Sequence, residues 1–334
     1  MTSSWKRFLF LQVPVAALTL ALIAQALSWA LSDVPMRRDR TDELALAVLT
    51  DPANYRIVLL ADSITRNATA RISLGEPGEV ANLATHAHFG MAGELLLLRR
   101  YLSAHPAPQY VVIAMAPEMY NWVSDTRLVR YNLWHTFRER DERSFLKTYL
   151  PDIDGRDWLP AIADLQERII EPFASLLKHQ YLAHWGRETA RIGAGSLIPD
   201  PDRAIDPSMP TDPKALNDVI SEGLQTVPAP INAAALRQLC LLSEQYGFRV
   251  NLVWPPKAAE IEDPMVASGA LAELEERIRT IMADHCHVDT IFNFNKIRTY
   301  KVSNLHRDMV HLFGEGWEQR YASDLRKYLN ALPD

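Results

Sequence analysis

Ile57-Val58-Leu59-Leu60-Ala61-Asp62-Ser63-Ile64-Thr65 begins as an apolar run and leads directly into an acid and a serine. We predict a strand over Tyr55–Leu60. Because it is apolar on both faces, it fits the centre of a parallel sheet covered by helices. Tyr110–Met115 is a second strand of this kind. Further strands are predicted at 79–83, 248–254 and 288–294, and helices at 90–103, 233–246, 270–283 and 318–332. This alternation indicates an α/β fold, a three-layer open parallel sheet flanked by helices.

The composition is that of a globular protein with a sizeable core. The chain has 334 residues, of which 48% are hydrophobic and 23% charged, and its formal net charge is -6. No basic stripe is interleaved with aromatic residues, so the sequence argues against a nucleic-acid partner. The acidic balance also gives no reason to expect a strongly anionic partner.

The N-terminus carries a long uncharged segment, Phe8–Leu31, preceded by Lys6 and Arg7. At about 1.5 Å per residue a helix of this length crosses the hydrocarbon core of a bilayer. The two basic residues favour a cytoplasmic N-terminus, with the rest of the chain on the periplasmic, extracytoplasmic side of the inner or plasma membrane. The alternative is a cleaved signal peptide, for which Ala24-Gln25-Ala26 is the only site-like match.

These features divide the chain into three parts. Residues 1–32 are expected to form a membrane anchor and residues 33–54 a juxtamembrane linker with a first helix. Residues 55–334 are expected to form the α/β domain, with a helical insertion or cap at about 121–230.

The two cysteines, Cys240 and Cys286, could pair in an oxidising compartment, and the sequence leaves this open. His285-Cys286-His287 suggests a cluster of metal ligands. Adjacent residues rarely bind one metal together, however, so we predict no metal and no other cofactor.

Ser63 lies just past the first core strand. Ligands of open α/β sheets bind at the carboxyl ends of strands, where such a side chain is exposed. A helix starting near Ser63 would also point its N–H groups at an oxyanion formed there. The alternative is that Asp62 or Ser63 only caps that helix.

Asp308 and His311 form a second pair near the end of the chain. Their spacing puts both on one side of a turn, so the carboxylate could orient the imidazole and leave its other nitrogen free to take a serine proton. The alternative is a solvated loop. Together with Ser63, the pair would supply a nucleophile, a base and an orienter.

The combination resembles the SGNH/GDSL hydrolase superfamily. Ala61–Thr65 resembles its opening Gly-Asp-Ser-Leu block, and Asp308–Leu312 resembles its closing Asp-x-x-His block. Val80–Ala84, followed by Gly90, looks like its second block, whose glycine N–H serves the oxyanion hole. The order of the blocks agrees as well. The resemblance implies an SGNH-hydrolase-like, flavodoxin-like domain.

The resemblance also implies roles for individual residues. Ser63 would be the nucleophile, His311 the base and Asp308 its orienter. The N–H groups of Ser63 and Gly90 would form the oxyanion hole.

The sequence departs from this pattern in two places. Ala61 stands where the family usually has glycine, and Ala116–Asn121 follows the third strand without the usual Gly-x-Asn-Asp. Asn121 could replace the missing oxyanion donor if the loop is longer. The superfamily's membrane-anchored polysaccharide and cell-wall O-acetylation proteins share the second departure, so they are the subgroup that this chain most resembles.

Three further side chains are predicted to contact substrate: Asp62, Glu118 and Tyr120. Glu118 and Tyr120 follow the carboxyl end of a core strand, where they could line a pocket and contact a sugar. The alternative is a capping carboxylate and a packed tyrosine.

Two functions follow from these features. The first is an outward-facing, membrane-anchored O-acetyltransferase or esterase acting on O-acyl groups of a polysaccharide. Its partners would be the glycan, the bilayer around Phe8–Leu31 and a membrane-bound acyl-donor protein. The second is a non-catalytic scaffold or glycan-binding component of an envelope assembly.

Overall fold

We analysed a computed structural model of the chain. It describes residues 5, 8–16, 18–19, 22, 40–70, 72–76, 78–85, 89–121, 133–134, 136–151, 153, 213–283, 286, 288–297, 300, 311–312 and 315–333. The chain divides into two compact units, which we describe separately. Residues 1–39 and 130–189 belong to the smaller unit, and residues 40–129 and 190–334 to the larger one.

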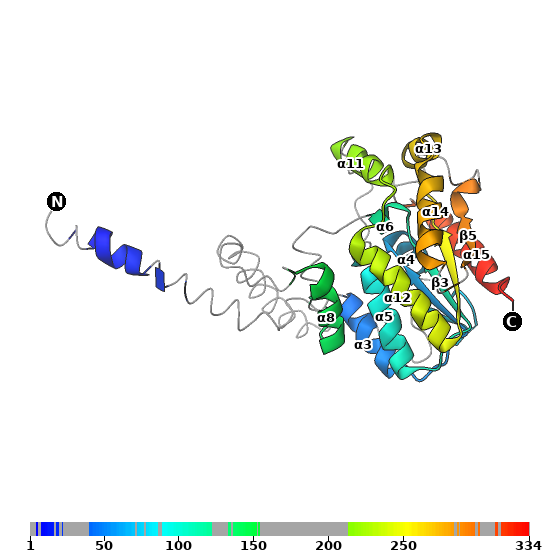
Figure 1. Ribbon diagram of the computed structural model, residues 1–334, viewed down its shortest axis with the longest axis horizontal. Helices are drawn as coiled ribbons and strands as arrows, with labels where there is room; N and C mark the ends of the chain where they lie inside the picture. The colour runs from blue at the N-terminus through cyan, green and yellow to red at the C-terminus, as the bar shows by residue number, and fades with distance from the viewer. Residues whose placement is uncertain are drawn as a thin grey trace. The chain divides into compact units, whose positions relative to one another are not determined.

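The larger unit is built on one five-stranded sheet whose strands are all parallel. The strands lie in the order β2-β1-β3-β4-β5, which is the flavodoxin-like order. This confirms the predicted open parallel sheet. Figure 1 shows this sheet among the helices that surround it. The strands are β1 (Ile57–Ala61), β2 (Val80–Asn82), β3 (Tyr110–Ala114), β4 (Arg249–Trp254) and β5 (Val288–Asn293).

Helices cover both faces of this sheet. On one face, α5 (Gly90–Ala104) contacts β1, α12 (Pro230–Tyr246) contacts β4 and α14 (Ala270–Met282) contacts β5. On the other face lie α4 (Ser63–Thr69) and α15 (Glu315–Asn330), which pack together. The remaining elements of this unit are α3 (Arg40–Thr50), α6 (Glu118–Asn121), α11 (Pro213–Gly223), α13 (Ala259–Ala267) and the 3-10 helix η4 (Phe294–Lys296).

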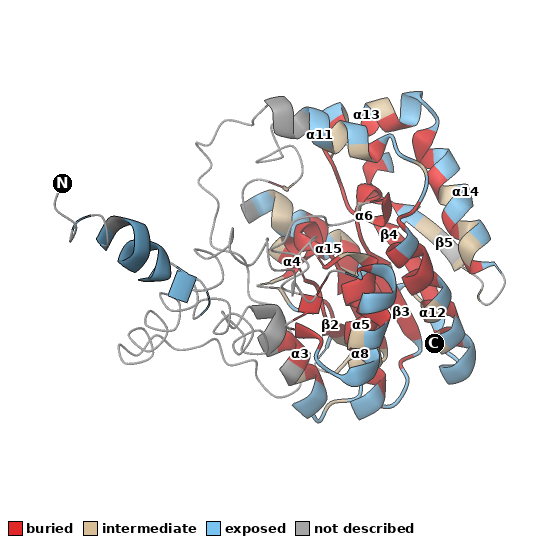
Figure 2. Cartoon of the chain, turned by 60° about the vertical axis from the view of Figure 1, so that its left-hand side comes forward, coloured by how far each residue is buried: buried red, intermediate tan, exposed pale blue. Residues whose placement is uncertain are grey.

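The core forms because alternate strand residues point to opposite faces. Ile57, Leu59 and Ala61 of β1 share a buried cluster with Tyr321 and Leu325 of α15, four residues apart and therefore on one face of that helix. Figure 2 shows the central strands buried, while α12 and α14 carry exposed outer faces. Both faces of the sheet are covered by helices, which explains why the strands have continuous apolar sequences.

The ends of α12 follow sequence signals. The helix begins with Pro230 in its first turn and ends at Gly247, whose φ of 77° is left-handed. The predicted start at residue 233 was three residues late. We did not predict α13, because Pro264 lies inside it and weakens its helical pattern.

In the segment predicted as a juxtamembrane linker, residues 40–50 form α3, which packs against α5 and buries Leu44, Ala45 and Val48. In the smaller unit, the described elements are η1 (Phe8–Gln12), a π-helix, and α8 (Arg140–Tyr149). Most of the predicted insertion, including 154–212, lies outside the described residues.

The predicted membrane anchor has no support from the structure. Within the part of the chain that the structure describes, we find no helix long and apolar enough to cross a membrane. Much of Phe8–Leu31 lies outside that part. The anchor therefore stays a prediction.

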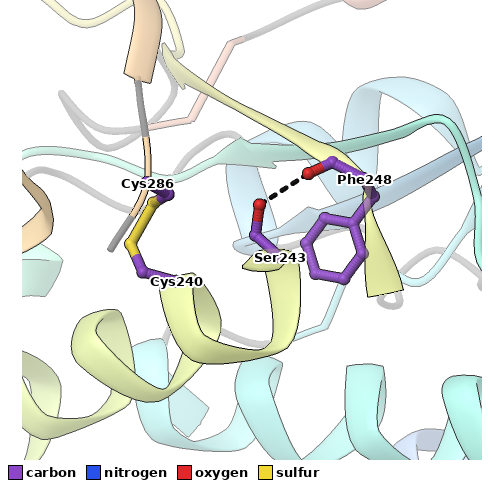
Figure 3. The surroundings of a disulfide bond; sticks show 4 residues. All are labelled: Cys240, Ser243, Phe248 and Cys286. Carbon is purple, nitrogen blue, oxygen red and sulfur yellow. Dashed lines mark hydrogen bonds between the residues drawn. A yellow bond between two sulfur atoms is a disulfide. The ribbon is translucent and has the colours of Figure 1, made fainter. Parts of the chain in front are cut away.

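Cys240 and Cys286 form a disulfide, which the sequence had left open. It joins α12 to the residues that precede β5, as Figure 3 shows. One turn further along α12, the Ser243 hydroxyl donates a hydrogen bond to the Phe248 carbonyl over 2.5 Å. The end of α12 is thus fastened to the start of β4 and to the segment before β5.

Replacing both cysteines with serine is expected to lower the free energy of unfolding by about 2–4 kcal/mol, because the unfolded chain loses a cross-link between residues 46 positions apart. Urea denaturation of the purified chain measures this. Reduction of the wild type should give the same loss. A wild-type midpoint that does not respond to reductant would contradict the prediction.

Candidate active site

The turn after β1 places Ser63 at the carboxyl edge of the sheet. Helix α4 begins at Ser63, and Asp62 is its N-cap, accepting hydrogen bonds from the N–H groups of Ile64 (3.0 Å) and Thr65 (3.5 Å). The Asp62 N–H donates to the Ala114 carbonyl at the end of β3. The cap is therefore Asp62, which leaves the hydroxyl of Ser63 available for another role.

The Ser63 hydroxyl is hydrogen-bonded to His311. Ser63 Oγ and His311 Nε2 lie 2.9 Å apart, although the two residues are separated by 248 positions in the chain. Ser63 is 8% exposed. When Nε2 carries no proton, the hydroxyl donates to it, which is the arrangement that a general base needs to activate a nucleophile.

Asp308, the predicted orienter of His311, lies outside the described residues. Its role therefore stays a prediction.

Asp62 is fully buried beside this pair, and its pKa is raised to about 6. Burial is the main cause, and the negative charge of Glu118 adds to it. The Ala116 N–H, 2.7 Å from Oδ2, and the nearby His311 act in the opposite direction. Asp62 thus holds together the turn after β1 and the end of β3, at an electrostatic cost.

This cost predicts a pH dependence of stability. Unfolded Asp62 should titrate near 3.8, so between about pH 4 and pH 6 the folded state binds its proton more tightly and stability falls as pH rises. The advantage of wild type over Asp62→Asn should therefore shrink from pH 4 to pH 7, by on the order of 3 kcal/mol. Urea denaturation at several pH values measures it. An advantage that grows with pH would instead mean that the three N–H donors dominate.

Gly90 is the first residue of α5 and has a left-handed φ of 54°. A Cβ at this position would lie 3.3 Å from Asn232 Oδ1. The left-handed backbone therefore favours glycine here, and the close approach of Asn232 adds a tight contact for any larger residue. Asn232 also donates from Nδ2 to the carbonyls of Met119 (3.0 Å) and Tyr120 (3.1 Å), so it joins α12 to α6 beside Gly90.

Asn121, the predicted substitute oxyanion donor, makes a different contact. Its Nδ2 donates a hydrogen bond to the Gln225 carbonyl, 104 residues away. Its Oδ1 is buried and finds no partner among the described residues. The structure therefore brings Ser63 and His311 together but shows no described contact between Ser63 and Asn121.

Glu118 pairs with Lys257 at the ends of β3 and β4. The ammonium of Lys257 donates to Glu118 Oε2, and the two side chains are 1% and 2% exposed. Asn295 fixes the lysine backbone, since its Oδ1 accepts from the Lys257 N–H and its Nδ2 donates to the Pro255 carbonyl at 3.2 Å. Glu118 is thus a buried carboxylate paired with Lys257, and its contact with a sugar stays a prediction.

Tyr120 is fully buried. Burial raises the pKa of its hydroxyl, and the nearby Asp62 and Glu94 carboxyls raise it further. Its Oη has no hydrogen-bond partner among the described residues. The side chain is therefore packed in the interior, close enough to Asp62 and Glu94 to be influenced by their charges.

Sequence reasoning missed three residues around this site: Glu94, Asn232 and Lys257. Each of them has an unusual sequence position that the structure now explains. Glu94 is the single charge in the apolar run from Met91 to Leu98, and Lys257 follows a core strand directly after two prolines. Asn232 stands in the first turn of a predominantly apolar helix.

Comparison with known proteins adds little to this geometry. No family model matches the chain, and no curated protein matches it. A solved structure provisionally described as a platelet activating factor from Streptococcus pneumonia is similar with a TM-score of 0.41 at 10% identity, covering 94% of this chain and 99% of that one. A likeness this distant carries no functional argument, so the candidate site must be judged from its own residues.

Proposed function

We propose that the chain is a serine-dependent acyl-transfer enzyme. The observation that carries the proposal is the 2.9 Å contact between Ser63 Oγ and His311 Nε2 at the carboxyl edge of the sheet. This edge, between β1 and β3, is where the strand order reverses and where open α/β sheets bind ligands.

The reaction follows from the two side chains. Ser63 Oγ attacks the ester carbonyl while His311 takes its proton, and the N–H groups of Ser63 and Gly90 bind the oxyanion. His311 then returns the proton to the departing alkoxide, which leaves an acyl group on Ser63. A second hydroxyl, from water or a sugar, loses its proton to His311 and attacks the acyl carbon. The bond between that carbon and Ser63 Oγ then breaks, and His311 returns the proton to Ser63, which releases the acid or the acylated sugar. Asp308 orients His311 throughout.

The proposed substrate is an O-acetylated polysaccharide of the cell envelope, and transfer to a sugar is favoured over hydrolysis. The uncharged run Phe8–Leu31 supports an anchor beside a membrane-bound acyl donor. The disulfide between Cys240 and Cys286 supports an oxidising, extracytoplasmic location. Asp62, Glu118 and Tyr120 are proposed to shape the substrate pocket.

A specific observation favours the second candidate, a non-catalytic scaffold or glycan-binding module. The amide of Asn121 donates to Gln225, and Glu118 is paired with Lys257. Two of the side chains expected around the reacting ester thus have other partners.

The test uses the purified full-length chain in detergent. Turnover of an aryl acetate, together with labelling of Ser63 by a serine-reactive phosphonate, supports the enzyme. Acetylated product on an added oligosaccharide, detected by mass spectrometry, supports transfer over hydrolysis. Absence of both turnover and Ser63 labelling would favour the scaffold.

A further inference from the structure

Glu94 is a buried acid that the reaction described above does not use. It lies in the second turn of α5, is 1% exposed, and is followed by four leucines that are fully buried. Acidic side chains are almost never so fully buried unless they have a specific partner. Its contacts therefore indicate what the residue does.

Those contacts lead to the end of β1. Glu94 Oε1 accepts a hydrogen bond of 2.5 Å from the Thr85 hydroxyl, and the Thr85 N–H donates to the Ala61 carbonyl over 2.7 Å. The other carboxyl oxygen, Oε2, is buried and has no hydrogen-bond partner among the described residues. Thr85 thus links the Glu94 carboxyl to Ala61, which lies two positions before Ser63.

The same side chain also belongs to the helix that begins with Gly90. Residues four apart lie on one face of a helix, and helical side chains lean toward its N-terminus, so Glu94 extends back toward the turn that Gly90 opens. One carboxyl therefore connects the segment that carries Ser63 with the helix that carries Gly90. These are the two residues whose N–H groups would bind the oxyanion.

Electrostatics agree with a neutral Glu94. Burial is the largest cause of a pKa raised well above 4.5, and the charge of Asp62 adds to it. Asp62 accepts three backbone N–H bonds, whereas the Glu94 carboxyl accepts one bond, from the Thr85 hydroxyl, so Asp62 is the better site for the negative charge. In its protonated form, which burial favours, Glu94 still offers an acceptor to Thr85 and adds no second negative charge beside Asp62.

We propose that Glu94 is a positioning residue that fixes the separation between Ser63 and Gly90, and through it the geometry of the oxyanion hole. This inference rests on the proposed function. One donor of an oxyanion hole contributes a factor of about 10²–10³ in rate. If the N–H groups of Ser63 and Gly90 are no longer held at the right separation, a large part of this factor should be lost.

The test compares Glu94→Leu, Glu94→Gln and Thr85→Val in the full-length chain. The Leu and Val variants should lower kcat for an aryl acetate about 10–100-fold with KM nearly unchanged, since the oxyanion forms only in the transition state. The Gln variant keeps the acceptor for Thr85 and should restore kcat to within about 3-fold of wild type. Leu98→Met, one turn further along the same helix, is the matched control and should leave kcat unchanged.

Hydrogen exchange of peptides covering 58–64 and 85–93 gives a readout that does not depend on catalysis. Exchange should accelerate in Glu94→Leu and Thr85→Val but not in Glu94→Gln or Leu98→Met. If the wild type is active and Glu94→Leu has the same kcat and the same exchange rates, the role of Glu94 is overturned and the proposed function stands. If the wild type is inactive but exchange of both peptides accelerates in Glu94→Leu, the proposed function is overturned. The link that Glu94 makes between the segment of Ser63 and the helix of Gly90 then still stands.

Discussion

Ser63→Ala is expected to lower aryl acetate turnover by about 10⁴-fold or more, because it removes the atom that attacks the carbonyl. His311→Ala should cost a similar factor. The double variant should be little worse than either single one, since nucleophile and base act as a unit. The comparison of kcat/KM among the four proteins measures this.

The free energy of unfolding should change little in Ser63→Ala. The cap of α4 is supplied by Asp62, so removal of the Ser63 hydroxyl leaves the capping bonds in place. Ser103→Ala, at an exposed position near the end of α5, is the matched control and should retain wild-type turnover. A Ser63→Ala protein that keeps a tenth or more of the activity would mean that another group performs the attack.

The strands were predictable because their environment is uniform. A central parallel strand is covered on both faces, so its sequence is an unbroken apolar run such as Tyr110–Met115, and β3 was predicted to within one residue. The contact between Ser63 and His311 was also predictable from the sequence. A serine after the first strand and a histidine before the last helix converge in this topology, although they are 248 residues apart.

Other parts of the site depend on pairings that periodicity does not encode. The Asn121 amide donates a hydrogen bond to the Gln225 carbonyl, 104 residues away. The residues around each of the two give no sequence signal of this contact. Glu118 and Lys257 meet because β3 and β4 are adjacent and in register, which requires the strand order as well as the strands. Glu94 looked like one charge on an apolar helix until the loop after β2 placed Thr85 beside it.

Lys257→Met is expected to lower the free energy of unfolding by about 3–5 kcal/mol, because it leaves the Glu118 carboxylate buried without its cation. Chemical denaturation measures the loss. Glu118→Leu combined with Lys257→Met should recover most of it, since a well-packed apolar pair replaces a buried ion pair at little cost. Arg277→Met, which breaks an exposed pair with Glu273, is the matched control and should change the free energy of unfolding little, because solvent screens that pair.

The double variant also separates the pairing of Glu118 with Lys257 from its predicted contact with a sugar. If the carboxylate only pairs with Lys257, the stabilised double variant should turn over the aryl acetate and an acetylated oligosaccharide as wild type does. If Glu118 contacts the sugar, the double variant should regain stability and keep aryl acetate turnover, but lose activity on the oligosaccharide through a raised KM. A double variant as unstable as Lys257→Met would contradict the electrostatic explanation, because the unpaired charge would be gone and the defect would remain.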